Sequence, residues 1–552
     1  MLIKHKLLFI KLVYLLKIRL MKNLLFSILL FSFLGLNAQI SDFKLILEPV
    51  SVNGLMGVQS YAVGQYNGKW LIVGGRLDGL HRRQPWASFD INGHNNQLIV
   101  VDPLSKQKWT SPLTSLPDSI EEQLSSTNPN FFQEGNTLFF MGGYGYSNTV
   151  LNHITYPRLT AIDLPGVINA IINNLPITPY FRQISDNAFA VSGGRLEKIY
   201  DTYYLVGGHR FDGRYNPMNN PTFTQSYTNQ IRKFKIMQDA NGIYVTHLPY
   251  ITDTLNLHRR DYNVAPQIMP DGKEGLTAFS GVFRLDADLP FLNAVNIDST
   301  SYEVDSNFSQ YYNHYHCAHM PVYDSVNNEM HTFFFGGISQ YYDSSGVLVQ
   351  DNNVPFVKTI ARVSRNANGV MAEYKSETQM PGLLGAGSEF ILNKDIAHYE
   401  NKVIKLNAIQ TDTALLGYIF GGISSSLPNI FFINTGMESA AFNQFFKVKF
   451  VNSGFTSADV LNPQSISSLR LQVFPNPNDG DFEIRYHLKE STDVYISISD
   501  INGKTIKTDT LLNNNAGDYN KKYHFNVEYL SGIYFVNIRT KYESAVQKII
   551  ID

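Results

Sequence analysis

The sequence predicts an all-β protein with two folded units, a large repetitive domain and a small C-terminal one. Its 552 residues exceed what one ordinary hydrophobic core accommodates, so at least two units are expected. Aromatic residues make up 13% of the chain, and most are tyrosine and phenylalanine, which favour strands. A short apolar run that ends in a pair of small residues recurs six times, and the C-terminal part consists of short alternating segments between turn residues.

The recurrent unit ends on two small residues, in most cases two glycines. Glycine lacks a Cβ atom and adopts positive φ, so a glycine pair suits the point where a strand ends against its neighbour. The unit resembles the kelch repeat, in which each blade has four antiparallel strands and the glycine pair closes the second strand. Six such units imply a six-bladed kelch-type β-propeller. The pairs are Gly74-Gly75, Gly142-Gly143, Gly207-Gly208, Ser280-Gly281, Gly336-Gly337 and Gly421-Gly422.

The first repeat matches the kelch pattern best, although it departs from it in places. A third strand from Leu98 to Val101 is followed by the turn Asp102-Pro103 and by Trp109 in the fourth strand, but Val101 stands where the family has a tyrosine. The pairs are 56 to 85 residues apart, so the repeats must also contain long loops. Third strands of the other blades are expected at residues 159–162, 230–236, 292–297, 359–363 and 445–451.

A segment before the first repeat, from Phe43 to Leu47, alternates as a strand but has no partner in its own repeat. A closed ring has to protect its edges. We therefore assign this strand to blade six, where it would join the two ends of the domain.

The N-terminus has the pattern of an export signal. Lys22 precedes an apolar run of thirteen residues, and Ala38 is a small residue at the expected cleavage point before Gln39. A membrane-spanning helix needs about 20 residues, so we expect a signal peptide over residues 1–38 and no integral membrane segment in the mature protein. The basic stretch before the run is unusually long, which suggests that translation starts at Met21.

A proline motif opens the C-terminal domain. Phe474, Pro475, Asn476 and Pro477 precede Gly480, and short strands separated by Asn-Gly and Ser-Gly turns follow. This order resembles the type A sorting domain of the type IX (Por) secretion system. The resemblance implies a small immunoglobulin-like β-sandwich, the type IX secretion machinery as a partner, and a location in the extracellular medium or on the outer cell surface.

These observations set the expected domain boundaries. After the signal peptide, residues 39–452 form the kelch-like propeller. Residues 453–469 are a linker rich in serine, asparagine and proline, and residues 470–552 form the sorting domain.

Charge and cysteine content exclude several classes of function. A formal net charge of -2 gives no field that would attract nucleic acid, so no nucleic-acid partner is expected. The single cysteine, Cys317, excludes an intrachain disulfide framework and a thiolate zinc cluster. We expect no cofactor.

Aromatic and basic residues gather in two sets of propeller loops, and they predict a ligand face. Connections after the second strands and before the first strands emerge at the same end of alternating strands. Aromatic planes suit sugar rings and guanidinium groups suit carboxylates, so a binding module for a glycan or protein ligand fits these loops. Alternatively, the arginines and histidines tie neighbouring blades together. The candidate ligand-binding residues are Trp86, Arg82, Arg210, Arg214, Tyr215, Arg260 and His316.

Two enzymatic hypotheses compete with a binding role, which we favour. His314 and His316 beside Cys317 invite comparison with copper radical oxidases, because imidazole binds copper well and some of these enzymes are kelch propellers. Sialic acid mutarotases are also six-bladed kelch proteins with sugar-binding arginines. No signature residue of either family can be carried over, and no catalytic residues can be singled out, so we expect neither catalysis nor a bound metal.

Overall fold

The computed structural model describes most of the chain between residues 44 and 551. The expected signal peptide, with Met21, Ala38 and Gln39, lies outside the described residues, as does almost all of the expected linker. Among the described residues, no helix is long and apolar enough to cross a membrane. The described ranges are 44–218, 220, 222–240, 242–344, 347–411, 413–451, 469–500, 505–525, 531–540 and 544–551.

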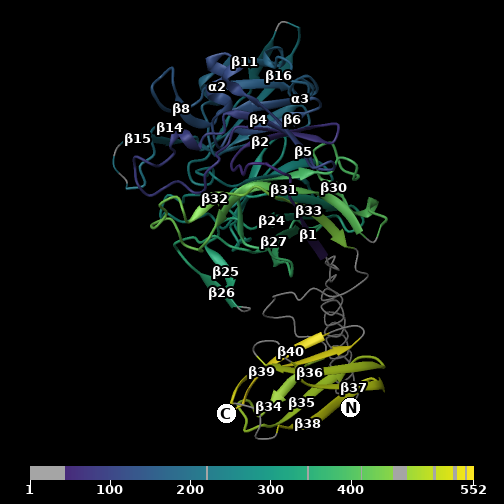
Figure 1. The fold of residues 1–552 in the computed structure, drawn as a ribbon. Coiled ribbons are helices and arrows are strands. Elements are labelled where there is room, and N and C mark those ends of the chain that lie inside the picture. Colours follow the sequence, from purple (N-terminus) through teal and green to yellow (C-terminus); the bar gives the residue numbers. More distant parts are fainter. Residues whose placement is uncertain are drawn as a thin grey trace, which may run out of the picture. The chain divides into compact units, whose positions relative to one another are not determined.

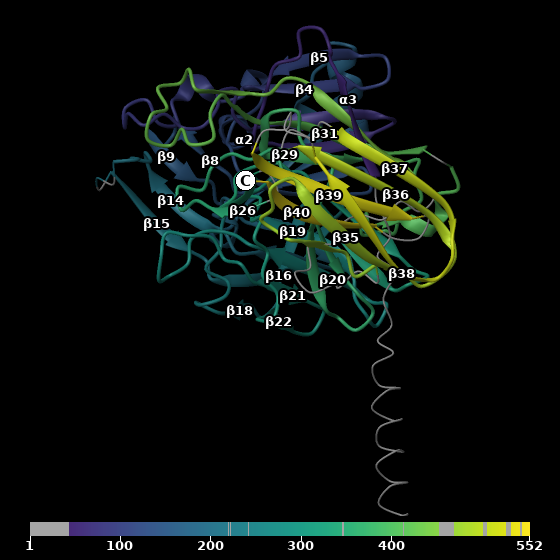
Figure 2. The same ribbon diagram turned by 90° about the horizontal axis from the view of Figure 1, so that it is seen from below.

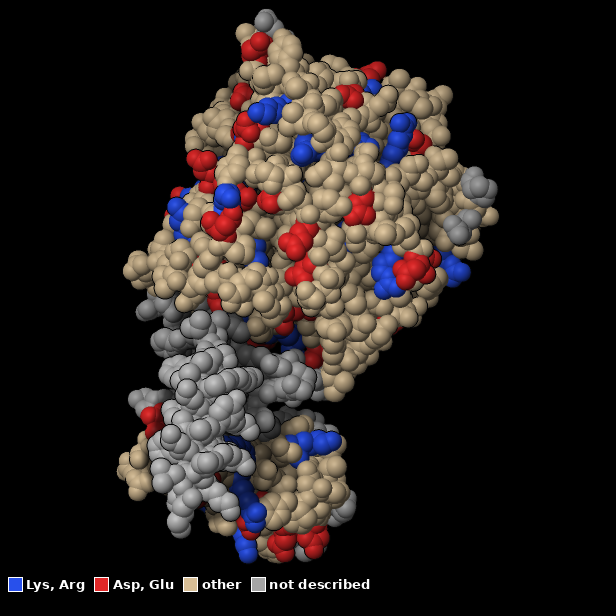
Figure 3. All heavy atoms as spheres, turned by 180° about the vertical axis from the view of Figure 1, so that it is seen from behind, with Lys and Arg blue, Asp and Glu red and all other residues tan. Residues whose placement is uncertain are grey.

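The chain divides into two compact units, Met1–Gly454 and Phe455–Asp552, and strands dominate both (Figure 1). The all-β prediction is therefore confirmed. Charged side chains of both signs lie interspersed on the face shown in Figure 3, as the near-zero net charge of the sequence leads one to expect. The helices of the larger unit are short, namely α2 (Asp118–Leu124) and α3 (Leu164–Ile172).

Six main sheets build the larger unit, and each contains four consecutive antiparallel strands; in the fifth sheet a short additional strand also pairs in parallel with the first strand. Five of the sheets use strands in chain order, whereas the sixth takes its last strand from the start of the unit. In order from first to fourth strand, they are β2 (Ala62–Tyr66), β3 (Lys69–Val73), β4 (Gln97–Asp102), β5 (Gln107–Pro112); β6 (Asn130–Glu134), β7 (Thr137–Met141), β10 (Arg158–Asp163), β11 (Phe181–Ser185); β12 (Arg195–Ile199), β13 (Thr202–Val206), β16 (Gln230–Gln238), β17 (Ile243–His247); β19 (Asn263–Ile268), β20 (Glu274–Phe279), β21 (Ala294–Ile297), β22 (Tyr302–Asp305); β23 (His319–Asp324), β24 (Glu329–Phe335), β27 (Ile360–Arg365), β28 (Met371–Lys375); and β29 (Leu383–Leu392), β31 (Thr413–Ser425), β33 (Phe445–Val451), β1 (Lys44–Val50).

Short additional strands decorate these sheets, mainly within the connections between second and third strands. Three such connections fold into two-stranded hairpins, and three single short strands pair with a main sheet. The hairpins are β8 (Tyr144–Ser147) with β9 (Asn152–Thr155), β14 (His209–Gly213) with β15 (Phe223–Tyr227), and β25 (Tyr341–Ser344) with β26 (Val347–Gln350); the single strands are β18 (Ile251–Thr252), β30 (Ile404–Lys405) and β32 (Ser439–Ala441).

The first strands of the sheets lie next to one another in chain order, from β2 through β6, β12, β19 and β23 to β29. Seen from below, elements of the first four sheets also follow one another around the unit (Figure 2). A closed circle of six backbone hydrogen bonds joins the starts of the six sheets, with one residue for each sheet. Five of these residues lie two or three positions before the first strand, and the sixth lies within β29. We call these six residues the axial ring. The bonds run from Ser60 N to Gly387 O (2.8 Å), Asn128 N to Ser60 O (3.0 Å), Gly193 N to Asn128 O (3.2 Å), Asp261 N to Gly193 O (2.8 Å), His316 N to Asp261 O (3.2 Å) and Gly387 N to His316 O (2.7 Å).

The glycine pairs have a steric role where one sheet meets the next. Gly142 directly follows β7 and has a φ of +67°. A Cβ there would lie 2.0 Å from the carbonyl oxygen of Val191, which precedes the first strand of the next sheet. No larger residue fits such an approach. Ser280, which replaces the first glycine in the fourth repeat, has a positive φ of 54° as well.

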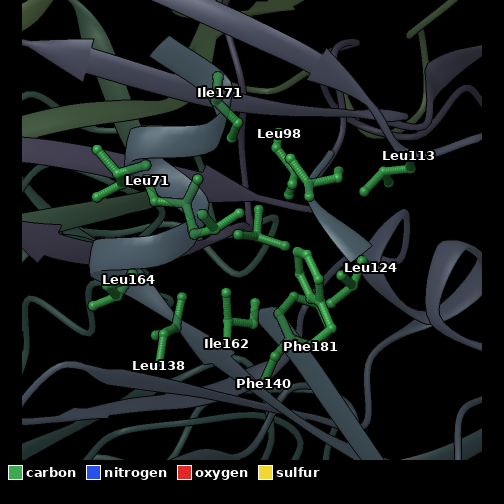
Figure 4. Packing of buried hydrophobic residues seen from close by; sticks show 14 of the residues in the cluster. Leu71, Leu98, Leu113, Leu124, Leu138, Phe140, Ile162, Leu164, Ile171 and Phe181 are labelled. Carbon is green, nitrogen blue, oxygen red and sulfur yellow. The ribbon is translucent and has the colours of Figure 1, made fainter. Parts of the chain in front are cut away.

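Apolar side chains fill the space between neighbouring sheets. Between the first two sheets, Leu71 and Leu98 from one sheet meet Leu138 and Phe140 from the other, and helix α3 packs Leu164 into the same cluster (Figure 4). Each sheet is covered on both sides, so its strands carry apolar residues on both faces.

The closing strand lies where the sequence places it. Strand β1 pairs antiparallel with β33 in the sixth sheet, from Lys44 opposite Val451 to Val50 opposite Phe445. The predicted pairing of this segment with the end of the sixth repeat is therefore confirmed from Lys44 onward; Phe43 lies outside the described residues. All five expected third strands also occur, as β10, β16, β21, β27 and β33.

The C-terminal unit consists of two antiparallel sheets around one apolar core. The proline motif holds its last strand in place, because Asn476 Oδ1 accepts a hydrogen bond from Ile550 N (2.8 Å) and Asn476 Nδ2 donates to Lys548 O (2.8 Å). Gly480 N donates to Asn478 Oδ1 in the following turn. The strands are β34 (Gln472–Phe474), β35 (Asp481–Leu488) and β38 (Gly517–His524) in one sheet, and β37 (Thr505–Asn514), β36 (Thr492–Asp500), β39 (Gly532–Thr540) and β40 (Ser544–Ile551) in the other.

Candidate functional site

The connections after second strands and before first strands emerge at the same end of the six sheets, because neighbouring strands run antiparallel. We call this side of the larger unit the loop face. It carries the three hairpins, and most of the aromatic and basic residues that the sequence singles out lie there.

A pair of opposite charges stands at the centre of a polar cluster on the loop face. Arg260 Nε donates a hydrogen bond to Tyr227 Oη over 3.1 Å, and Arg260 Nη1 pairs with the carboxylate of Asp261. The guanidinium carbon lies 5.1 Å from the centre of the Phe283 ring. Burial alone would lower the pKa of Arg260, but Asp261 holds it above its usual range. Arg260 is therefore charged at neutral pH.

Aromatic rings from several connections surround this pair. His81, from the connection between β3 and β4, meets Tyr215 edge-on with ring centroids 4.9 Å apart. Tyr227 stacks on His258 at 3.7 Å. Tyr315 precedes β23; burial raises its pKa, and the charges of Arg260, Asp261 and Tyr227 also act on it. We call Arg260, Asp261, Tyr215, Tyr227, Tyr315 and His81 the Arg260 cluster.

Two buried polar atoms of the Arg260 cluster, Tyr315 Oη and His81 Nδ1, have no hydrogen-bond partner among the described residues. Burial raises the pKa of Tyr315 well above its usual range and lowers the pKa of His81 to about 4, so at neutral pH one is a phenol and the other a neutral imidazole. A buried polar group without a partner costs about 1–3 kcal/mol. A ligand hydroxyl that bonded to these atoms would remove that cost.

Of the predicted ligand residues, only Tyr215 and Arg260 belong to the Arg260 cluster. Arg214 Nε donates to Ser88 O over 2.9 Å, and its Nη2 lies 3.6 Å from Asp90 Oδ2. It thereby ties a connection of the third sheet to one of the first. Arg210 pairs with Asp212 on its own strand, with Nε 2.7 Å from Oδ2. The Arg214 contacts tie loops of two sheets together, as in the alternative in which arginines link blades, whereas the Arg210 contact stays within one hairpin strand.

Trp86 and Arg82 lie on the exposed connection between β3 and β4. The Trp86 side chain is 74% exposed. Arg82 is also exposed, and its guanidinium stands close to Gly436 in the connection between β31 and β33. Neither residue contacts the Arg260–Asp261 pair among the described contacts, although Arg82 directly follows His81 in the chain.

His316 belongs to the axial ring, and its side chain joins two buried charges. Its Nε2 lies 2.9 Å from Glu389 Oε1 on β29, and the same carboxylate accepts two bonds from Arg195 on β12, at 2.8 Å and 3.2 Å. Burial opposes ionisation of Glu389, but Arg195 and His316 lower its pKa to about 2. The charged group therefore cross-links sheets three, five and six beneath the axial ring.

Several of these residues escaped the sequence analysis. Arg195 and Glu389 are 194 positions apart, and neither strand marks them: β12 reads RLEKI, with two further charged residues, and Glu389 lies in the second half of β29. Asp261 directly follows Arg260 and could have been recognised as its partner. Tyr227 lies at the end of a hairpin strand, and nothing in its neighbourhood marks it.

The surroundings of Cys317 do not match a copper radical site. The thiol packs among apolar residues such as Phe279, Phe308 and Phe334, and burial raises its pKa to about 12. His314 stacks on Phe334 and its Nδ1 bonds to Gly336 O, whereas His316 binds Glu389. Within the described residues, no group of three histidine, cysteine or acidic side chains could hold a metal ion.

Comparison with known families identifies the C-terminal unit. Residues 472–552 match the secretion system C-terminal sorting domain family. This domain marks proteins that the type IX system exports to the cell surface or the extracellular space, and it implies an interaction with the secretion machinery. No curated protein matches the sequence.

Comparison with solved structures yields distant likenesses. YjhT is 10% identical with a TM-score of 0.40, and the alignment covers 73% of this chain and 99% of YjhT. An exo-1,5-alpha-L-arabinanase from a bovine ruminal metagenomic library is 8% identical with a TM-score of 0.25, and the alignment covers 72% and 95% of the two chains. Dimeric latent PorU from Porphyromonas gingivalis is 10% identical with a TM-score of 0.14, over 70% and 36%. TM-scores below 0.5 carry no argument about fold or function.

Proposed function

We propose that this exported protein is a binding module, in which a six-bladed kelch-type β-propeller presents a glycan-binding site on its loop face. The propeller spans residues 39–452 and follows a signal peptide that is cleaved between Ala38 and Gln39. A linker over residues 453–469 leads to the sorting domain, an immunoglobulin-like sandwich over residues 470–552.

The arrangement of the larger unit supports six blades. Six sheets with four consecutive antiparallel strands each occur in chain order, successive first strands are neighbours, and the axial ring closes with one residue at the start of each sheet. Glycine pairs at the ends of second strands support the kelch type, because they allow the close approach between sheets that Gly142 makes to Val191.

The observation that carries the ligand assignment is the pair of unpartnered polar atoms in the Arg260 cluster. Tyr315 Oη can donate or accept a hydrogen bond, and His81 Nδ1 can do either according to its tautomer. Neighbouring aromatic rings offer apolar faces to the carbon-bound hydrogens of a sugar. Few polar groups within an aromatic setting are typical of small-ligand sites.

The charge of the cluster favours a neutral sugar over an acidic one. Arg260 already has a carboxylate partner in Asp261, so a second carboxylate would have to displace it. A sugar hydroxyl can accept from the guanidinium and donate to the carboxylate without breaking the pair.

Screening the secreted protein on a glycan array identifies the ligand, and point variants test the site. Tyr315→Phe removes only the unpartnered hydroxyl, so we expect affinity for the selected glycan to fall about fivefold to tenfold, the worth of one hydrogen bond. The melting temperature should rise slightly rather than fall, because the substitution removes a buried hydroxyl that has no protein partner. Tyr244→Phe, a change on the exposed face of β17, is the matched control.

Affinity of Tyr315→Phe within twofold of the parent would contradict the site. The same preparation can be assayed for sialic acid mutarotase and copper radical oxidase activity. Turnover in either assay would replace the binding-module proposal with an enzymatic one.

A further inference from the structure

Large apolar side chains project from two neighbouring connections of the loop face. Trp86 is 74% exposed, Phe432 65% and Met437 89%, and Leu427 and Ile433 are each half exposed. Trp86 lies between β3 and β4, and the other four lie between β31 and β33. We call these five residues the apolar platform. Isolated apolar residues are common on protein surfaces, but a group of this size on two joined loops marks an interaction site.

Hydrogen bonds hold the two connections together. Arg83 N donates to Asn434 O over 3.0 Å, and Arg83 Nη1 donates to Phe432 O over 2.6 Å. Asn434 Nδ2 donates in return to the carbonyl oxygens of Leu80 and His81, at 2.7 Å and 3.0 Å. The exposed side chains therefore project from a fixed base, and little further ordering of the backbone is needed for them to make contact.

The hairpin of the fifth sheet continues this surface. Asn429 Nδ2 donates to Asp351 Oδ2 over 2.9 Å, and Phe356 N donates to Pro428 O over 2.8 Å. Val347, at the start of β26, is 62% exposed. Protruding apolar side chains thus extend over the connections of three sheets.

Two charged residues near the apolar platform, Arg82 and Glu438, differ in how far their charged groups are engaged by the protein. Arg82 is exposed, and its guanidinium makes no hydrogen bond to the described residues. Glu438 is turned toward its own loop, where its Oε2 accepts from Thr435 N (2.7 Å) and Met437 N (3.1 Å). The Glu438 carboxylate is therefore engaged within its own loop, whereas the Arg82 guanidinium remains available to an anionic partner.

We propose that the apolar platform docks the protein onto a lipid surface, with Trp86, Phe432 and Met437 inserted at the boundary of headgroups and acyl chains and Arg82 on a lipid phosphate. Side chains that protrude this far suit a soft, extended surface, whereas a protein partner would need a matching pocket for each of them. Tryptophan and arginine both prefer the membrane interface. Binding would grow with the apolar area inserted and with attraction to anionic lipids. This role is separate from glycan binding at the Arg260 cluster.

Flotation with vesicles tests the proposal on the full secreted protein. We expect it to float with vesicles of phosphatidylcholine and phosphatidylglycerol, and to bind phosphatidylcholine alone more weakly. Trp86→Ser combined with Met437→Ser should lower the partition coefficient by about tenfold or more, since two large apolar groups are lost. Arg82→Ser should lower binding more strongly to the vesicles that contain phosphatidylglycerol, whose headgroup has a net negative charge, than to phosphatidylcholine alone. Glycan affinity should not change in any of these variants.

Leu104→Ser combined with Val326→Ser provides the matched control. These residues are 76% and 77% exposed, and they lie in turns at the opposite end of the sheets. Equal loss of vesicle binding in the control, or no binding of the parent to either vesicle, would overturn the lipid assignment. If the parent ignores vesicles but self-associates in sedimentation, and the platform variants abolish that association, the apolar platform binds a second copy instead.

Discussion

At the scale of single residues, the most constrained charges are those beneath the axial ring. Glu389 is buried and still ionised, because Arg195 meets it with two hydrogen bonds and His316 with one. Removing one partner of a buried pair leaves the other charge unpaired, which is costly. Glu197, two positions along β12 from Arg195, shows the opposite shift: burial raises its pKa to about 7, against the pull of Lys402 and Arg195.

These two carboxyl groups predict opposite effects of pH on stability. The pKa of Glu389 is about 2 in the folded state and near 4.3 in an unfolded chain, so its contribution is present above about pH 4.3 and lost as the pH falls toward 2. The pKa of Glu197 is raised, so its contribution is lost as the pH rises from about 4.3 to about 7.

Urea titrations of Glu389→Gln and Glu197→Gln test this assignment. We expect Glu389→Gln to lower the free energy of unfolding by about 3–5 kcal/mol at pH 7 and to flatten the loss of stability below about pH 4. Glu197→Gln should leave the loss of stability below about pH 4 unchanged, and it should flatten the loss of stability that occurs as the pH rises toward 7. If Glu389→Gln still loses stability below about pH 4 as the parent does, another group controls that loss.

At the scale of elements, the axial ring explains why some glycines cannot be exchanged. Gly387 sits within β29 at a φ of +73°, and a Cβ there would lie 2.6 Å from Ser60 Oγ and 3.0 Å from Ser60 N. That nitrogen is the donor that closes the ring onto Gly387 O. A side chain at this position would therefore push two sheets apart.

Gly387→Ala should destabilise the larger unit more than an alanine at an open glycine of similar conformation. Gly135, in the turn after β6, has a φ of +55° and open space around its Cβ position, so Gly135→Ala should cost only the backbone term of about 1 kcal/mol. Gly387→Ala adds the clash, and we expect about 1–3 kcal/mol more. Equal melting temperatures for the two variants would mean that the ring tolerates the extra atom.

The sequence predicted the elements that depend on local pattern. The glycine pairs located the ends of the second strands in five sheets, whereas β31 continues past Gly421 and Gly422 to Ser425. The alternation of the first segment located β1, and the apolar runs located the third strands. It did not predict the hairpins within long connections, such as β14 with β15, because short half-exposed strands have weak periodicity. The axial ring consists of backbone groups and the Arg195–Glu389 pair spans 194 positions, so neither leaves a local signal.

At the scale of the whole molecule, the sorting domain determines where the protein goes. Residues 472–552 match the sorting family, and within their own unit they have a separate apolar core. The larger unit closes through β1 and β33 without using any strand of the C-terminal unit. Export and folding of the propeller should therefore be separable.

Deleting residues 453–552 should abolish export and leave the remainder folded in the periplasm. Cell fractionation shows where the truncated chain accumulates, and its melting temperature should match the propeller transition of the full protein. Mass spectrometry of the secreted full chain should find Gln39 at its N-terminus. Secretion of the truncated chain at the parental level would contradict the role of the sorting domain.

The central claim, that ligands bind at the Arg260 cluster on the loop face, is tested most directly by hydrogen–deuterium exchange of the secreted protein with and without an array-selected glycan. We expect protection in the segments that contain His81, Tyr215, Tyr227, Arg260 and Tyr315, and unchanged exchange in the turns at the opposite end of the sheets. Protection confined to those opposite turns or to the C-terminal unit would contradict the claim.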